Sequence, residues 1–213
     1  MTDTWSERAG LYRTSAVHAQ GPDLDLIVEW SAGRRTALDV ATGGGHVARR
    51  LRDAGLDVVT CDPAPGMGPD VICPAEDLPF ADASFDVVVC RRAAHHFDDV
   101  SKAVQEMARV ARHLVLLQDA VWVSEQVEEA ERLRDPSHKR HHTQAEWRDV
   151  FARSDLAVEA AERFDERLDF ASWFARTGCE GETAELVREL LADRSDDEAW
   201  TYPYVVFRTS KRP

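Results

Sequence analysis

The segment that most constrains this chain is residues 36–50, TALDVATGGGHVARR. A short apolar run containing Asp39 leads into three glycines, Gly43 to Gly45, and then into a helix-like run from His46. A strand, a glycine turn and a helix start in this order form a nucleotide-type pocket. Glycine lets the backbone pass close to a ligand, and the helix N-terminus offers unpaired N–H groups to a carboxylate or phosphate.

Strands and helices alternate along the rest of the chain, which predicts an α/β fold with a doubly wound sheet. Apolar and β-branched runs predict strands at residues 36–40, 57–61, 70–73, 85–90, 113–118, about 156–164 and 204–209. Helical spacing predicts helices at about 45–54, 100–111, 125–134 and 144–153, the last with Thr143 and Glu146 as a capping box. No linker is long enough to separate domains, so we expect a single domain over residues 1–213.

Composition limits the partners and the compartment. The chain has 39 acidic and 26 basic residues and a net charge of −13, which repels nucleic acids and anionic lipid surfaces. It has no run of eighteen apolar residues and no signal-peptide shape, so we expect a cytoplasmic protein without a membrane partner. The four cysteines form no C-x-x-C pair, which argues against disulfides and zinc. Oligomeric state is left open between monomer and homodimer.

Two cofactors fit the glycine turn. GGGHVA satisfies the G-x-G-x-x-A form of the dinucleotide fingerprint. Asp39-Val40-Ala41-Thr42-Gly43-Gly44-Gly45, however, resembles motif I of the class I S-adenosylmethionine (SAM) methyltransferases, roughly D-x-G-x-G-x-G, with Ala41 in place of the first glycine. Asp62 follows Asp39 by 23 residues, at the end of the next strand, where a ribose-binding acid is expected.

The segment Pro74-Ala75-Glu76-Asp77-Leu78-Pro79-Phe80 resembles the D-A-E-x-L-P-F stretch of the ubiquinone/menaquinone-biosynthesis-like methyltransferases. In that family the acid–alanine pair meets the adenine edge. Pro74 replaces the acid here, so Glu76, Asp77 or a backbone carbonyl must accept from the adenine. The resemblance implies a Rossmann-like, seven-stranded, mostly parallel sheet of order 3-2-1-4-5-7-6, with the seventh strand antiparallel.

The resemblance also implies how the chain is divided and which residues bind. Residues 1–35 are expected to be a helical lid, 36–120 the cofactor-binding half, and 121–213 the substrate-side helices and last two strands. The expected SAM-binding residues are Tyr12, Asp39, Ala41, Thr42, Gly43, Gly45, Asp62, Pro63, Ala75, Glu76, Asp77, Leu78 and Arg91.

Histidines are the candidates for chemistry and for substrate contact. His95 and His96 follow the fourth strand, where the resemblance places the sulfonium and the substrate, so either could serve as a general base. His18, His96 and His141 are expected to contact the substrate. No carboxylate lies at ligand spacing from His138, His141 and His142, so we expect no metal site there and a solvated or substrate-facing loop instead.

The favoured function is therefore a SAM-dependent methyltransferase with a small-molecule acceptor. Two alternatives remain open. One is a SAM-binding protein that transfers no methyl group, such as a cyclase or regulatory binder, because a fold does not fix a function. The other is a nicotinamide-dependent oxidoreductase, although the sequence has no Tyr-x-x-x-Lys pair.

Overall fold

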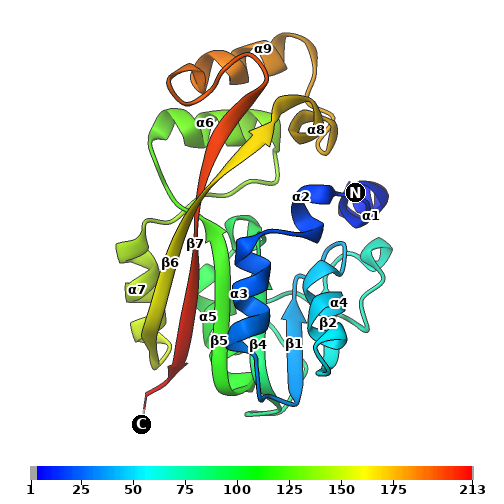
Figure 1. Ribbon diagram of the computed structural model, residues 1–213, viewed down its shortest axis with the longest axis vertical. Helices are drawn as coiled ribbons and strands as arrows, with labels where there is room; N and C mark the ends of the chain where they lie inside the picture. Colours follow the sequence, from blue (N-terminus) through cyan, green and yellow to red (C-terminus); the bar gives the residue numbers. More distant parts are fainter. Residues whose placement is uncertain (1–3, 213) are drawn as a thin grey trace.

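The computed structural model describes residues 4–212 as a seven-stranded sheet with helices on both faces (Figure 1). The strand order is β3-β2-β1-β4-β5-β7-β6, and β7 runs antiparallel to both β5 and β6. This confirms the predicted fold class and strand order. The strands are β1 (Thr36–Val40), β2 (Asp57–Asp62), β3 (Val71–Ile72), β4 (Phe85–Arg91), β5 (Ala111–Ala120), β6 (Leu156–Asp169) and β7 (Ala199–Lys211).

The central strands are mostly apolar because helices cover both of their faces. Val87 and Val89 of β4 pack in one hydrophobic cluster with α3 (Pro22–Trp30) and α4 (His46–Asp53). Val88 of the same strand packs in the opposite cluster with α5 (Val100–Val110) and α7 (Gln144–Arg153). Because side chains alternate along a strand, β4 contributes residues to two hydrophobic clusters, one on each face of the sheet.

Beyond the sheet, β6 and β7 continue as a two-stranded ribbon into an upper lobe that also holds α6 (Glu125–Arg134), α8 (Phe170–Ala175) and α9 (Gly181–Leu190) (Figure 1). A separate hydrophobic cluster, with Trp173 and Trp200 among its largest members, holds this lobe together. Both strands are longer than predicted. Their extensions pair only with each other, and the charged run ERFDERLD of β6 is largely exposed, so it lacks the apolar pattern of a buried strand.

Residues 1–35 were expected to form a helical lid. Within the described residues, α1 (Thr4–Arg13) and α2 (Ala16–Ala19) lie beside the carboxyl ends of β1 and β2 (Figure 1), whereas α3 packs against the sheet, so the name lid is kept below for residues 4–19. Ser6 Oγ accepts from the Gly66 N–H at 2.7 Å, in the turn that follows β2. Arg8 donates to the Thr177 carbonyl at 2.9 Å, on the upper lobe. The lid therefore bridges the two sides of the molecule.

Local details agree with most predicted boundaries. The capping box of α7 is present, and α5 runs directly into β5 without a glycine turn. The 3₁₀ turns are η1 (Pro65–Met67), η2 (Ala94–His96) and η3 (Ala192–Arg194). Among the described residues, every helix is too short or too polar to cross a membrane.

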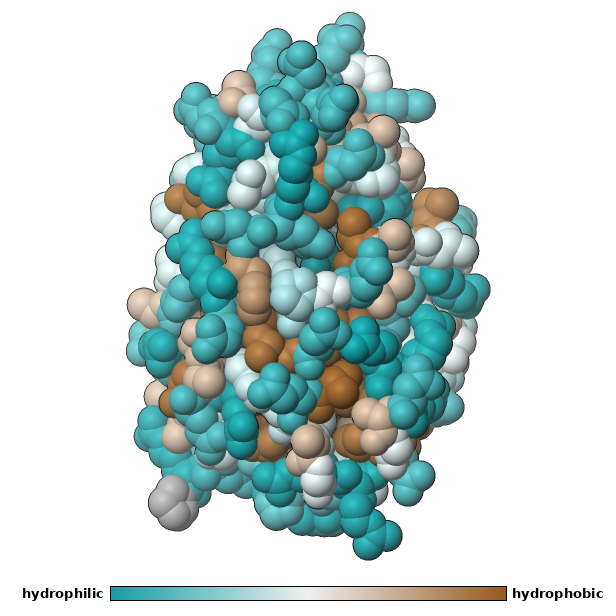
Figure 2. All heavy atoms as spheres, in the orientation of Figure 1, coloured by the Kyte–Doolittle hydropathy of each residue, from teal (hydrophilic) through white to brown (hydrophobic). Residues whose placement is uncertain are grey.

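The face drawn in Figure 2 is largely hydrophilic, and its hydrophobic side chains gather toward the centre. Large hydrophobic side chains that are well exposed occur on three separate elements, as Leu11 on α1, Ile72 on β3 and Leu186 on α9. This scattered distribution leaves the expectation of a monomer or homodimer untested.

Candidate functional site

A cavity of about 320 Å³ lies at the carboxyl ends of β1, β2 and β4, and residues from the lid and the upper lobe complete its wall. This is where ligands bind in open α/β sheets, because the strand order reverses between β1 and β4. Its size is within the range of small-molecule sites.

Asp39 fixes the shape of the glycine turn. Its Oδ2 accepts from the Thr42 hydroxyl at 2.6 Å and from the Ala48 N–H at 3.1 Å, so it joins the end of β1 to the first turn of α4. Burial raises the pKa of Asp39 to about 6, although these two hydrogen bonds oppose the rise. Asp39, Ala41 and Thr42 all line the cavity, as the sequence predicted.

Asp62, at the end of β2, faces the same turn. One carboxylate oxygen accepts from the Gly43 N–H at 3.0 Å and the other from the Ala64 N–H at 2.9 Å. These bonds hold the carboxylate in a fixed orientation on the cavity wall, beside Pro63. A side chain at Gly43 would enter open space at this wall, so glycine keeps that space free for a ligand.

Gly44 is the glycine whose importance the sequence did not reveal. A Cβ at Gly44 would lie 2.7 Å from the Tyr12 carbonyl oxygen of the lid. The same carbonyl lies 2.8 Å from His46 Nε2 at the start of α4. Glycine at this position therefore lets the lid approach the turn closely.

The segment after β3 contributes Ala75 and Glu76 to the wall. Glu76 Oε1 accepts from the N–H groups of Asp98 and Asp99, at 3.1 and 3.3 Å. Asp77 is exposed and Leu78 is buried in the hydrophobic core, and neither lines the cavity. Glu76 is therefore the carboxylate of this segment that lines the cavity.

Arg91 joins the end of β4 to the lid. Its Nε donates to Asp23 at 2.6 Å and its Nη1 donates to the His18 carbonyl at 2.8 Å. Asp23 lies in the first turn of α3, which begins at Pro22. His18 lines the cavity, where burial and then the neighbouring Arg92 lower its pKa well below the usual value.

His95 forms a buried pair with Asp119. Its Nδ1 lies 2.6 Å from Asp119 Oδ1, and its backbone N–H donates to Asp119 Oδ2 at 2.8 Å. Burial lowers the pKa of His95, but the Asp119 carboxylate outweighs burial and raises it above the usual value. The pair is a His–Asp dyad at the ends of β4 and β5, with His95 on the cavity wall.

His96 also lines the cavity but is engaged differently. Its Nδ1 lies 3.2 Å from both the carbonyl oxygen and the hydroxyl of Ser137, and its ring packs against Trp5 at 4.7 Å. Burial, followed by the neighbouring His95, lowers the pKa of His96 well below the usual value. The ring therefore stays neutral and contacts the lid.

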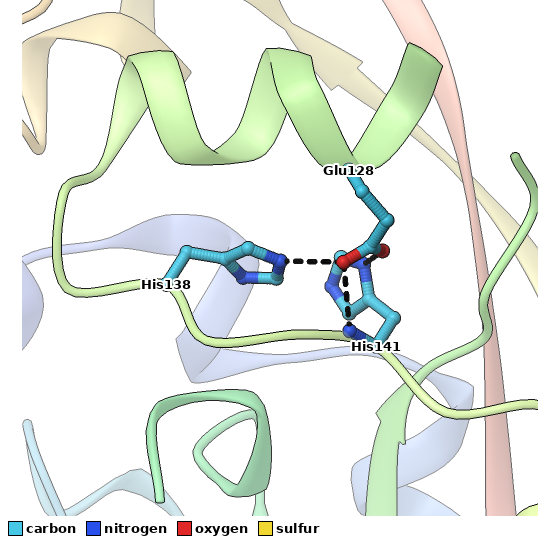
Figure 3. A group of neighbouring side chains, drawn as sticks. All are labelled: Glu128, His138 and His141. Carbon is cyan, nitrogen blue, oxygen red and sulfur yellow. Dashed lines mark hydrogen bonds and ion pairs between the residues drawn. The ribbon is translucent and has the colours of Figure 1, made fainter. Parts of the chain in front are cut away.

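His141 does not line the cavity, contrary to its predicted substrate contact. Figure 3 shows Glu128 of α6 with its carboxylate toward both His138 and His141. Glu128 oxygens lie 2.7 Å from His141 Nδ1 and 3.0 Å from His138 Nε2, and all three residues are buried. The prediction of a solvated or substrate-facing loop was therefore wrong for His138 and His141. The Glu128 carboxylate of α6 holds both side chains in a buried position.

This Glu128–His138–His141 cluster places three potential ligand atoms within 4.8 Å of one another. In the sequence no carboxylate lies at ligand spacing from these histidines, but in the folded chain Glu128 lies beside both His138 and His141. The observed contacts satisfy Glu128 by hydrogen bonds alone, with the His141 N–H at 3.1 Å as a third donor. Burial raises the pKa of Glu128, but the hydrogen bonds from His138 and His141 together outweigh burial and hold that pKa well below its usual value.

Most of the predicted residues meet at one cavity. The exceptions are Gly45, which caps α4, and Asp77, Leu78 and His141. Asp119 was missed, although an acid after the apolar run LVLLQ was a usable signal. No local pattern marked the cavity residues of the upper lobe, which are Glu131, Arg134, Leu168, Trp173, Arg176 and Tyr202.

The chain is similar to proteins named as methyltransferases. A family model described as "Methyltransferase domain" matches residues 38–116. The uncharacterized methyltransferase YcgJ of Bacillus subtilis is 32% identical over 93% of this chain and 88% of its own length. The crystal structure of YcgJ superposes with a TM-score of 0.82 at 28% identity, covering 90% of this chain and 98% of that one.

Two further relatives are also named as methyltransferases. The structure of the putative methyltransferase BH2331 from Bacillus halodurans has a TM-score of 0.78 at 26% identity and covers 91% of this chain and 100% of that one. The demethylmenaquinone methyltransferase of Renibacterium salmoninarum is 41% identical over 35% of this chain and 36% of its own length.

Proposed function

Because the chain belongs to the class I SAM-dependent methyltransferases, we propose that it binds SAM and transfers its methyl group to a small-molecule acceptor. The observation that supports this most directly is that Asp62 and His95 line the same cavity. A ribose-binding carboxylate and a candidate base then face one enclosed space.

The cavity residues fit the cofactor. The oriented Asp62 carboxylate is placed to accept from the two hydroxyls of a ribose, and Glu76 is placed to accept from an adenine amino group. The open space at Gly43 admits a ligand directly against the backbone. The acidic side chains Asp39, Asp62 and Glu76 suit a ligand that carries a sulfonium and an ammonium group.

When bound, SAM supplies a methyl group activated by its sulfonium. The protein aligns the acceptor with that methyl group and excludes water, which together can lower the barrier by several kcal/mol. Trp5 and Tyr12 of the lid and Trp173 of the upper lobe enclose the cavity on the side away from the sheet.

We assign the role of general base to His95 rather than to His96. Asp119 holds Nδ1 of His95, which leaves Nε2 as the nitrogen able to take a proton from an acceptor. Asp119 would also stabilise the imidazolium that results. His96, held by Ser137 and Trp5, would position the wall of the site.

Incubation of the protein with SAM and a library of small organic acceptors, followed by mass spectrometry for S-adenosylhomocysteine, tests the proposal. With a productive acceptor, His95→Ala should lower kcat by about 10²–10⁴-fold. His113→Ala is the matched control, since His113 is exposed at the start of β5. Binding of SAM without product from any acceptor would favour the non-methylating alternative.

A further inference from the structure

Charge is divided between the two sides of the cavity. Three acidic side chains of its wall, Asp39, Asp62 and Glu76, belong to the cofactor-binding half. The side formed by the end of β4 and the upper lobe is instead rich in arginine. Its charged wall residues are Arg91, Arg92, Glu131, Arg134 and Arg176. In a chain of net charge −13, four arginines around one cavity need an explanation.

Three of these arginines are neutralised by the protein itself. Each forms a short ion pair with an acidic side chain, and each is largely buried. The pairs are Arg91 with Asp23 at 2.6 Å, Arg92 with Glu166 at 2.7 Å and Arg134 with Glu131 at 3.1 Å. Their guanidinium groups therefore support the fold of the wall, and each of the three charges already has an acidic partner in the protein.

Arg176 differs from the other three. It directly follows α8, is only 9% exposed and lines the cavity. Within residues 4–212 its guanidinium makes no hydrogen bond and no ion pair. Burial, and then the nearby Arg134, lowers its pKa to about 10, so it remains charged at neutral pH, and the nearby carboxylate of Glu131 is already paired with Arg134. Buried arginines are rarely left without a partner, because desolvation of the charge is costly.

We propose that Arg176 binds an anionic oxygen group, a carboxylate or a phosphate, on the acceptor substrate. The guanidinium presents a planar fork of donors that matches both groups. This inference rests on the proposed function, because it assigns the upper-lobe side of the cavity to the acceptor.

The neighbours of Arg176 define the rest of that acceptor. Leu168 of β6, Trp173 of α8 and Tyr202 of β7 line the same side of the cavity. The Arg134 guanidinium stacks over the Trp173 ring at 4.5 Å and so fixes the position of this wall. An apolar, preferably aromatic, body carrying one acidic group therefore fits this side, with the acid at Arg176.

Calorimetric titration with three probes of similar shape tests the charge preference. The probes are 3-phenylpropionate, phenyl phosphate and the neutral 3-phenylpropionamide, each added to protein saturated with S-adenosylhomocysteine and to protein without it. We expect at least one anion to bind about tenfold or more tightly than the amide. Equal affinity for the anions and the amide would overturn the inference, and the preferred anion distinguishes a carboxylate from a phosphate.

Two variants assign the preference to one residue. Arg176→Gln should abolish the difference between anion and amide, whereas Arg148→Gln, on the exposed face of α7, should leave it unchanged. S-adenosylhomocysteine should bind Arg176→Gln as it binds the wild type. If that cofactor fails to bind the wild type, the proposed function fails, and the titrations without it still test the anion site.

Thermal unfolding separates ligand binding from a structural role. Because the charge of Arg176 has no partner, Arg176→Met should melt at the same temperature as the wild type or higher. A clear fall in Tm for Arg176→Met, together with an intact anion preference in Arg176→Gln, would show that the arginine only supports the fold.

Discussion

Asp39 combines a structural role with an unfavourable charge. Its carboxylate holds Thr42 and Ala48, but burial raises its pKa to about 6. Between its usual pKa of about 4 and 6, the unfolded chain releases a proton that the folded chain keeps. Rising pH therefore lowers the free energy of unfolding across this window. Above the window, the lost free energy stays constant.

Asp39→Asn should remove this pH dependence, because the amide oxygen can accept both hydrogen bonds without a charge. Relative to the wild type, the variant without ligand should gain up to about 3 kcal/mol of stability between pH 4 and pH 6.5. Urea denaturation at several pH values measures the difference. A stability gap that stays constant with pH would show that Asp39 is ionised in the fold as easily as in water.

His95 and Asp119 make a second prediction at the scale of single residues. Asp119 raises the pKa of His95 against the effect of burial, so Asp119→Asn should leave burial dominant and lower that pKa below about 6.5. NMR titration of the imidazole measures it directly. A base with a raised pKa becomes active as the pH rises through that value, so the acidic limb of the rate profile should move to lower pH in the variant. An unchanged His95 titration would rule out the dyad.

At the scale of elements, Glu128 ties the loop of residues 135–142 to α6. Glu128→Ala would leave the facing nitrogens of His138 and His141 buried without a partner, at a cost of at least about 2 kcal/mol. We expect a fall in Tm of roughly 4–8 °C in calorimetry.

The same measurement with EDTA tests whether hydrogen bonds alone account for the cluster. Wild-type Tm should be the same with and without the chelator, and metal analysis of the purified protein should find no stoichiometric ion. A large fall in Tm on chelation would instead identify Glu128, His138 and His141 as metal ligands.

Among the described residues of the lid, Arg8 makes hydrogen bonds to the upper lobe, and Val17 packs against the hydrophobic cluster of that lobe. Arg8 donates to the Thr177 carbonyl and lies 3.4 Å from Asp135. Arg8→Met should weaken S-adenosylhomocysteine binding roughly tenfold through loss of these bonds, with little change in Tm. Hydrogen exchange of residues 4–19 should become faster in the variant. Equal exchange in both proteins would mean that the lid is held from the cofactor-binding side alone.

At the scale of the whole molecule, the sheet was predictable because its strands alternate regularly with helices and are buried on both faces. The turn at Gly43 and the acids Asp39 and Asp62 were predictable because they lie in the last residues of two strands or just after them. The cavity residues of the upper lobe were not predictable. Leu168 lies in the charged, largely exposed extension of β6, and the others lie on or beside α6, α8 and β7, where no motif marks them. The contacts of Glu128 with His138 and His141, and the unpaired position of Arg176 at the cavity, arise only in the folded chain.

The arrangement places one cavity between a cofactor-binding half and a lobe built from the last half of the chain. Residues from α1, the sheet and α8 are far apart in the sequence, so the cavity forms only when the whole domain has folded. Binding of the cofactor should therefore report on the integrity of the entire fold.

Calorimetric titration with SAM, S-adenosylhomocysteine and NAD tests the central claim most directly. The account predicts binding of the first two and not of NAD, and a loss of roughly 1.5–3 kcal/mol in Asp62→Ala, as expected for charge-assisted hydrogen bonds to a ribose. Asp57→Ala, at the exposed opposite end of β2, should bind as the wild type does. Binding of NAD in preference to SAM, or unchanged SAM affinity in a folded Asp62→Ala variant, would contradict the account.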